Sequence, residues 1–291
     1  MQFLENTLKQ AQRFEESGKY LHSLQLYQIL LKNPKYKRVA TVRLAGAYEK
    51  LNRAELAKKI LQEYLSKPND DEEVRKLYVH FLIRHSYYEE ALDALSLISR
   101  ETNPEIYFLM GVANFNIDEY KIAEINFTEF ISNNSKSDLI PEALLFLAKT
   151  QVKLNKLNPA LIAAKKSADI YFQNHELHYV IAQIYFMKGM NYHAYESIRN
   201  SIKINKGDLS ILKCAGKILL KLKEYKKALN YFLDCYDRNN FDIEVLESIG
   251  NCYMKLDRIE IAKVYFKKLL KIDPDNASIS QLLKTEIYSE S

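Results

Sequence analysis

Stripes of apolar residues at helical spacing recur along the chain in pairs, and a short polar turn separates the two members of each pair. In one pair, Leu246, Ile249 and Tyr253 follow one another at intervals of three and four residues, as on one face of an α-helix. After the polar turn comes a second stripe, which consists of Ile259, Ala262, Phe266, Leu269 and Leu270 and ends before Asp273-Pro274. Because proline stops a helix, this pattern predicts two amphipathic helices joined by a short turn.

A small side chain returns in both helices of each pair at nearly constant intervals. The series on the first helix is Ala11, Ala45, Val79, Gly111, Ala148, Ala182, Gly216 and Gly250. The series on the second helix is Ser23, Ala57, Ala91, Ala123, Ala160, Ala194, Ala228 and Ala262. Both advance by 34, 34, 32, 37, 34, 34 and 34 residues. Such a period predicts stacked units, with small residues that let paired helices cross closely and aromatic residues that fill the groove beside them.

The array is expected to occupy residues 1–275, with a capping helix and tail at 276–291. Asn276 can cap that last helix, whose apolar face would contain Ile279, Leu282, Leu283 and Ile287. The one long step of 37 residues contains the polar segment 132–138. We interpret this segment either as a longer surface turn or as a soft joint between units 1–4 and units 5–8.

The units resemble the tetratricopeptide repeat. In the eighth unit, the residues that match the family pattern are Leu246, Ile249, Gly250, Tyr253, Ala262, Phe266 and Pro274. The seventh (Gly216, Tyr225, Ala228, Phe232) and second (Leu44, Tyr48, Ala57, Pro68) units are also similar. Departures are His178, where the family often has tryptophan, and Gln151 and Ala164 in place of large fillers in the fifth unit. The resemblance implies an all-α, right-handed α–α superhelical solenoid of helix hairpins that binds proteins.

Composition and motifs give no support to an enzyme, a metal site or a cofactor. Seven glycines in 291 residues form no phosphate-binding loop, and the segment His175–His178 lacks the second histidine of a zinc-protease helix, since Tyr179 stands there. The paired acids Glu15-Glu16 and Glu89-Glu90 are expected in helix starts and turns, where they complement the helix dipole. Three cysteines without a CxxC pair, no signal peptide and no long apolar run favour a cytoplasmic protein.

In the resembled family the first helix of each unit lines a concave groove, so residues of that helix that point away from the packing are the candidate partner contacts. These are Lys76, His80, Arg84, Phe108, Phe115, Lys149, Lys153, Tyr179, Gln183, Phe186, Lys213, Lys217, Lys221 and Asn251. Odd units supply cations and even units aromatic residues. Lys213, Lys217 and Lys221 repel one another at four-residue spacing, which favours an anionic partner. For the lysines, the alternatives are that Glu224, Glu244 and Glu247 neutralise them or that a lysine-rich genome bias placed them there. For the aromatic residues, the alternative is packing between units.

The expected function is that of a non-enzymatic scaffold or adaptor, whose groove binds an acidic protein segment with interspersed apolar side chains. From family habit, the setting would be a platform in a multiprotein machine, including a membrane-associated secretion, pilus or flagellar assembly. The alternative is single-stranded nucleic-acid binding, because cations interleaved with aromatic residues also suit phosphates and bases. The mild net charge of +5 argues against that alternative. The sequence does not predict an oligomeric state.

Overall fold

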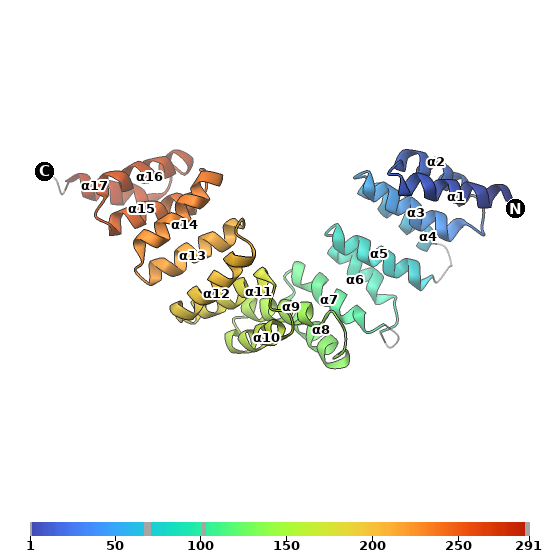
Figure 1. Ribbon diagram of the computed structural model, residues 1–291, viewed down its shortest axis with the longest axis horizontal. Helices are drawn as coiled ribbons and strands as arrows, with labels where there is room; N and C mark the ends of the chain where they lie inside the picture. Colours follow the sequence, from blue (N-terminus) through green and yellow to red (C-terminus); the bar gives the residue numbers. More distant parts are fainter. Residues whose placement is uncertain (1, 67–70, 101–102, 289–291) are drawn as a thin grey trace. The chain divides into compact units, whose positions relative to one another are not determined.

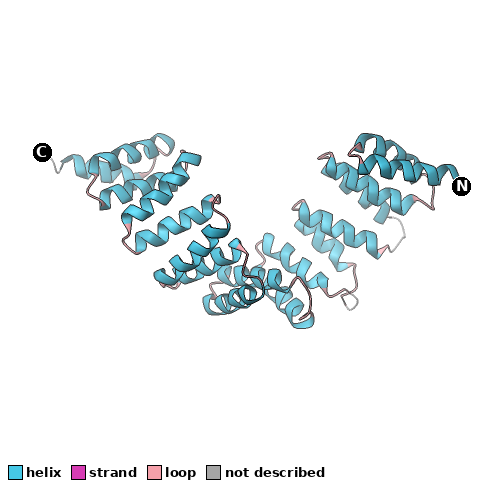
Figure 2. Cartoon of the chain, in the orientation of Figure 1, coloured by secondary structure: helices cyan, strands magenta, loops and turns pink. Residues whose placement is uncertain are grey.

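Helices account for all the secondary structure of the described residues, which are 2–66, 71–100 and 103–288 of the computed structural model, with side chains to residue 284 (Figures 1 and 2). The helices are α1 (Gln2–Glu16), α2 (Tyr20–Leu31), α3 (Lys37–Lys50), α4 (Ala54–Leu65), α5 (Glu72–Arg84), α6 (Tyr88–Ser96), α7 (Glu105–Asn116), α8 (Tyr120–Asn133), α9 (Ile140–Lys153), α10 (Leu157–Ile170), α11 (His175–Met187), α12 (Asn191–Ile204), α13 (Leu209–Lys221), α14 (Tyr225–Arg238), α15 (Ile243–Lys255), α16 (Ile259–Ile272) and α17 (Ala277–Tyr288).

The helices form two compact units, residues 1–135 with α1–α8 and residues 136–291 with α9–α17. Within each unit the chain builds antiparallel hairpins that stack in sequence order (Figure 1). We call the first helix of each hairpin, α1 to α15 in odd numbers, the A helix, and its partner the B helix. The predicted all-α solenoid of eight hairpins is confirmed.

The small residues of both series lie at the hairpin crossings and are buried. At three crossings the A helix has glycine and the B helix has phenylalanine. A Cβ atom added at Gly111, Gly216 or Gly250 would lie 2.6, 2.6 or 2.3 Å from the ring of Phe127, Phe232 or Phe266. The close crossing beside an aromatic filler is therefore confirmed, because no side chain fits between these helices.

A third series at the same period lies in the turn between each A helix and its B helix. Its members, all at positive φ, are Gly18, Asn52, Ser86, Asp118, Asn155, Gly189, Lys223 and Asp257. The next amide donates to the carbonyl five residues before it, as from Arg258 to Tyr253 at 2.9 Å. This is the Schellman ending, which satisfies carbonyls at the helix C-terminus. Only two of the eight residues are glycine, so the series does not appear as a glycine pattern in the sequence.

The predicted last helix is confirmed as α17. The side-chain oxygen of Asn276 accepts a hydrogen bond from the Ile279 amide at 3.2 Å, which caps the helix. Ile279 and Leu283 are buried in a cluster with Phe266, so the helix covers the apolar end of the eighth hairpin. Two residues of the sequence argument, Pro68 and the side chain of Ile287, lie outside the described part of the chain.

The buried polar positions of units 5 and 6 have packing roles. His178 is buried, and its Nε2 is 2.9 Å from the carbonyl oxygen of Phe172, whose ring packs against the imidazole. Burial lowers the pKa of His178, although the bond to Phe172 opposes the shift. Gln151 and Ala164 are also buried. His178 therefore has a packing role in the fold.

Candidate functional site

The candidate partner contacts occupy four recurring positions on the A helices, which in α13 are Lys213, Lys217, Leu220 and Lys221. We call the first position the inner row and the last position, which is the C-terminal residue of each A helix, the end row. The inner row contains Lys76, Phe108, Leu145, Tyr179 and Lys213. The end row is Glu16, Lys50, Arg84, Asn116, Lys153, Met187, Lys221 and Lys255.

The inner row lies largely within the packing. Phe108 is only 7% exposed, and its ring lies 6.1 and 5.6 Å from the rings of Phe127 and Phe130. Leu145 is 3% exposed. Tyr179 is half-buried, and burial raises its pKa. The prediction of Phe108 as a groove contact is therefore wrong. Its ring packs against α8 of its own hairpin, whereas the alternative expected packing between units.

Two lysines of α13, Lys213 and Lys217, are neutralised by acids that begin the next A helix. Lys213 lies 3.0 Å from Asp242 and 3.3 Å from Glu244, and Lys217 pairs with Glu244. The hydrogen bond from Lys217 is the main reason why the pKa of Glu244 is lowered. The expectation that Lys213 and Lys217 repel each other without compensation is therefore wrong. The alternative, that Glu244 neutralises them, is confirmed. Glu224 instead pairs with Lys227.

Other candidate cations also have acidic partners. Lys76 pairs with Glu72 and Glu73 of its own helix. Arg84 bonds Glu49 of the preceding A helix at 3.0 Å, and Lys149 pairs with Glu176 of the following one. Such pairs cross-link neighbouring A helices, and being partly exposed each adds modestly to stability.

The remaining candidates are accessible to different degrees. Phe115, Gln183, Phe186 and Asn251 are half-exposed, and the Phe115 ring meets the edge of Tyr120 at 5.6 Å. His80 is exposed, and so are Arg84, Asn116, Lys153, Met187 and Lys221 of the end row. Lys255 is also exposed and was missed from the sequence, although its register in α15 equals that of Lys221 in α13. Lys221 and Lys255 form no ion pair with any residue that the structure describes.

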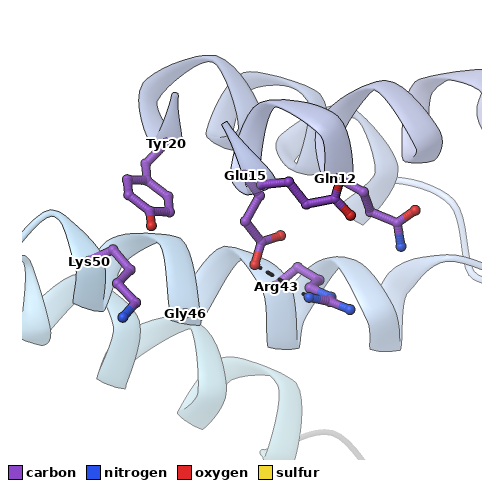
Figure 3. Close-up of a pocket in the computed structure, with 7 residues that line it drawn as sticks. Gln12, Glu15, Tyr20, Arg43, Gly46 and Lys50 are labelled. Carbon is purple, nitrogen blue, oxygen red and sulfur yellow. Dashed lines mark hydrogen bonds and ion pairs between the residues drawn. The ribbon is translucent and has the colours of Figure 1, made fainter. Parts of the chain in front are cut away.

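A pocket of about 320 Å³ lies between α1, the start of α2, and α3 (Figure 3). Its lining consists of Gln12, Glu15, Glu16, Tyr20, Arg43, Gly46 and Lys50. Glu15 accepts a hydrogen bond from the Tyr27 hydroxyl at 2.6 Å and one from Arg43 at 3.4 Å. Glu15 and Glu16 end α1, so the expectation that they complement the helix dipole in a helix start or turn is wrong for this pair. Glu89 and Glu90 do lie in the first turn of α6.

Other chemistry has no visible support in the described part of the chain. No group of three or more His, Cys, Asp or Glu side chains there could hold a metal ion. The cysteines Cys214, Cys235 and Cys252 are unpaired, and burial raises the pKa of the Cys252 thiol to about 12. None of the described helices is both long and apolar enough to cross a bilayer.

Family comparisons match three separate parts of the chain. Two models described as "Tetratricopeptide repeat" match residues 40–70 and 243–276. A third, described as "Anaphase-promoting complex, cyclosome, subunit 3", matches residues 153–235. No curated protein matches the chain.

Solved structures share the fold at low sequence identity. A MamA crystal structure is 21% identical, with a TM-score of 0.53, and the match covers 60% of this chain and 93% of that one. YrrB, "a TPR protein with an unusual peptide-binding site", is 16% identical with a TM-score of 0.56, covering 64% and 95%. The crystal structure of the APC/C hetero-tetramer Cut9–Hcn1 is 15% identical with a TM-score of 0.63, and the match covers 91% of this chain and 52% of that one. With its eight hairpins and these matches, the chain is a tetratricopeptide-repeat protein.

Proposed function

We propose that the protein is a non-enzymatic scaffold, which binds an acidic partner segment with apolar anchors along the A helices of residues 136–291. One observation carries the proposal. The end row of this unit presents Lys153, Met187, Lys221 and Lys255, all of them exposed, on four successive A helices. Met187 is 50% exposed, so an apolar side chain stands in a row of cations. Carboxylates of the partner would meet the lysines, and an apolar residue would cover Met187.

The spacing of the row suggests a register for the partner. Packed helices lie about 8–10 Å apart, and an extended chain advances about 3.3 Å per residue. About three residues of an extended segment therefore pass each A helix. The matching pattern is an acid, then an apolar residue three positions later, then two further acids at the same interval.

Lys213 and Lys217 contribute less to binding than the end row in this proposal. A partner carboxylate at Lys213 or Lys217 would have to displace Glu244, which already bonds both. Electrostatic orientation would therefore come mainly from the end row. These end-row lysines also complement the negative end of each helix dipole, so stability has to be measured beside binding.

We also propose that the scaffold acts in the cytoplasm, as a platform within a multiprotein assembly such as a secretion, pilus or flagellar machine. Its three unpaired cysteines, of which Cys235 and Cys252 are buried, suit a reducing compartment. Single-stranded nucleic acid is not proposed as the ligand. Acidic side chains pair with Lys149, Lys213 and Lys217 on this surface, and Met187 interrupts the end row, which argues against a phosphate backbone as the ligand.

A binding titration tests the proposal. The probe is a labelled, blocked ten-residue peptide with aspartate at its first, seventh and last positions, leucine at its fourth and serine elsewhere. We expect the double variant Lys221→Glu with Lys255→Glu to bind it at least tenfold more weakly, with a flatter salt dependence. The control Lys226→Glu changes an exposed lysine of the B helix α14 and should leave affinity unchanged. Equal affinity of the double variant would overturn the proposal, as would tighter binding of an oligonucleotide at the same lysines.

A further inference from the structure

Gly46 stands out among equivalent positions of the A helices. The other residues of that register are Gln12, His80, Val112, Lys149, Gln183, Lys217 and Asn251. Glycine inside a helix is destabilising relative to alanine, and at Gly111, Gly216 and Gly250 a phenylalanine ring explains it. At Gly46 a Cβ atom would meet no atom within 4 Å. Packing therefore does not explain this glycine.

Glu16 is the second departure from the array's own pattern. It is the only acid in the end row, whose other members are Lys50, Arg84, Asn116, Lys153, Met187, Lys221 and Lys255. A carboxylate at a helix C-terminus faces the negative end of the dipole, which is unfavourable. Glu16 is exposed and makes no hydrogen bond or ion pair with any residue that the structure describes. Nothing within the fold accounts for its charge.

Gly46 and Glu16 both line the pocket between α1 and α3. Figure 3 shows Gly46 between two ends of the pocket, with Glu15 and Arg43 on one side and Tyr20 and Lys50 on the other. Glu15 is already bonded to Tyr27 and Arg43. The pocket is open to solvent on one side, whereas sites for small molecules bury most of the ligand. A segment of a longer chain suits an open pocket better.

We infer that this pocket binds an extended peptide segment that carries a lysine or arginine side chain. The main chain of the segment crosses Gly46, where the missing side chain lets a backbone approach α3 closely. The basic side chain meets the carboxylate of Glu16, beside Glu15. This site lies in residues 1–135 and takes a basic side chain, so it is separate from the acidic-segment site of residues 136–291.

Three labelled, blocked heptapeptides that differ only at their central residue test the site on the full chain. We expect the peptide with arginine to bind, the peptide with glutamine to bind at least tenfold more weakly, and the peptide with glutamate not to bind. Gly46→Leu should abolish binding of the arginine peptide, because its side chain fills the pocket. Glu16→Gln should lower that affinity to the level of the glutamine peptide. The matched control Val112→Leu, at the same register of α7, should leave the affinity for the arginine peptide unchanged.

Equal affinities for the three peptides, no binding of the arginine peptide, or unchanged binding by Gly46→Leu would each overturn the inference. Circular dichroism and urea unfolding show whether Gly46→Leu keeps the fold, and Glu16→Gln gives a second test that leaves the helix backbone unchanged. The two sites are distinguishable. Gly46→Leu should bind the acidic ten-residue peptide normally, and the Lys221→Glu, Lys255→Glu variant should bind the arginine peptide normally.

Discussion

Volume at each hairpin crossing is shared between an A-helix residue and the residue sixteen positions later on the B helix. The pairs are Ala11 with Tyr27, Ala45 with Leu61, Val79 with Leu95, Gly111 with Phe127, Ala148 with Ala164, Ala182 with Ile198, Gly216 with Phe232 and Gly250 with Phe266. All sixteen residues are buried. At three crossings glycine makes room for the large ring of phenylalanine, whereas Ala148 and Ala164 are both small, so the residue types at the crossing vary from unit to unit.

Alanine should have opposite effects at two glycines of the A helices. Gly250→Ala places a Cβ against the buried ring of Phe266 and should lower the free energy of unfolding by about 1–3 kcal/mol. Gly46→Ala has open space and should raise it by about 0.5–1 kcal/mol. Urea unfolding of both variants measures the difference. Adding Phe266→Leu to Gly250→Ala recreates the pair at Ala45 and Leu61, and should restore part of the loss; stability changes of the same sign at both glycines would contradict the prediction.

A turn residue offers a second test at this scale. Lys223 has φ 61°, a conformation that costs a residue with a side chain about 1–2 kcal/mol. Lys223→Gly relieves this cost but adds freedom to the unfolded chain, so we expect a net gain of about 0.5–1 kcal/mol. The urea midpoint should rise. Lys267→Gly, at an exposed position inside α16, should lower it by about the same amount, and a fall in both variants would contradict the role of the turn.

The positions of the helices and of their ends can be predicted from nearby residues. Which residues on the outer faces of the helices are covered by a neighbour cannot be predicted in this way. The apolar stripes, small residues and Asn276 cap predict α15, α16 and α17 because those signals lie within a few residues of one another. The partner of Lys217 is Glu244, which belongs to the next A helix. Phe108 was misplaced for a related reason, since its neighbour Phe127 lies on another helix. Spacing on one helix cannot show which of its exposed faces a neighbour covers.

The pairs between α13 and α15 should make stability depend on pH. Burial opposes the charged form of Asp242, but bonds from Lys213 and the Val245 amide outweigh it, so its pKa is lowered. The pKa of Glu244 is lowered chiefly by the bond from Lys217. A lowered pKa in the folded state means that the stabilisation is present above the ordinary carboxyl pKa, about 4, and is lost as pH falls through the folded value.

Unfolding midpoints measured between pH 7 and pH 3 test this account. We expect Glu244→Gln to be less stable than the unchanged protein at pH 7 and to lose less stability on acidification, because one of the titrating carboxyls is gone. Glu260→Gln is the control, since Glu260 is largely exposed and, within the described part of the chain, pairs only with Lys263 of its own helix. If Glu244→Gln and Glu260→Gln show the same pH dependence, the ion pairs do not couple α13 to α15.

At the scale of the whole molecule, the 37-residue step in the repeat period corresponds to the connection between α8 and α9. The segment between α8 and α9 is six residues, 134–139, two more than each of the segments 171–174, 205–208 and 239–242 that connect later hairpins, although the connections before α5 and α7 are as long or longer. The boundary between the compact units falls between residues 135 and 136. The sequence could predict the irregular step, because the period itself reveals an insertion. It could not predict the mechanical behaviour of this segment, which depends on contacts between residues far apart in the chain.

Limited proteolysis distinguishes a soft joint from a longer surface turn at 132–138. In a stacked array each hairpin is stabilised by its neighbours, and a boundary between compact units is where local opening costs least. We expect a broad-specificity protease at low concentration to make its first cut in the middle of the chain near Asn134, leaving two fragments that resist further digestion. Mass spectrometry of the early fragments gives the site. Deleting Ser135 and Lys136 shortens the segment to the common length and should slow this cleavage severalfold; a first mid-chain cut in another turn would reject the joint, while leaving the hairpin array itself unchallenged.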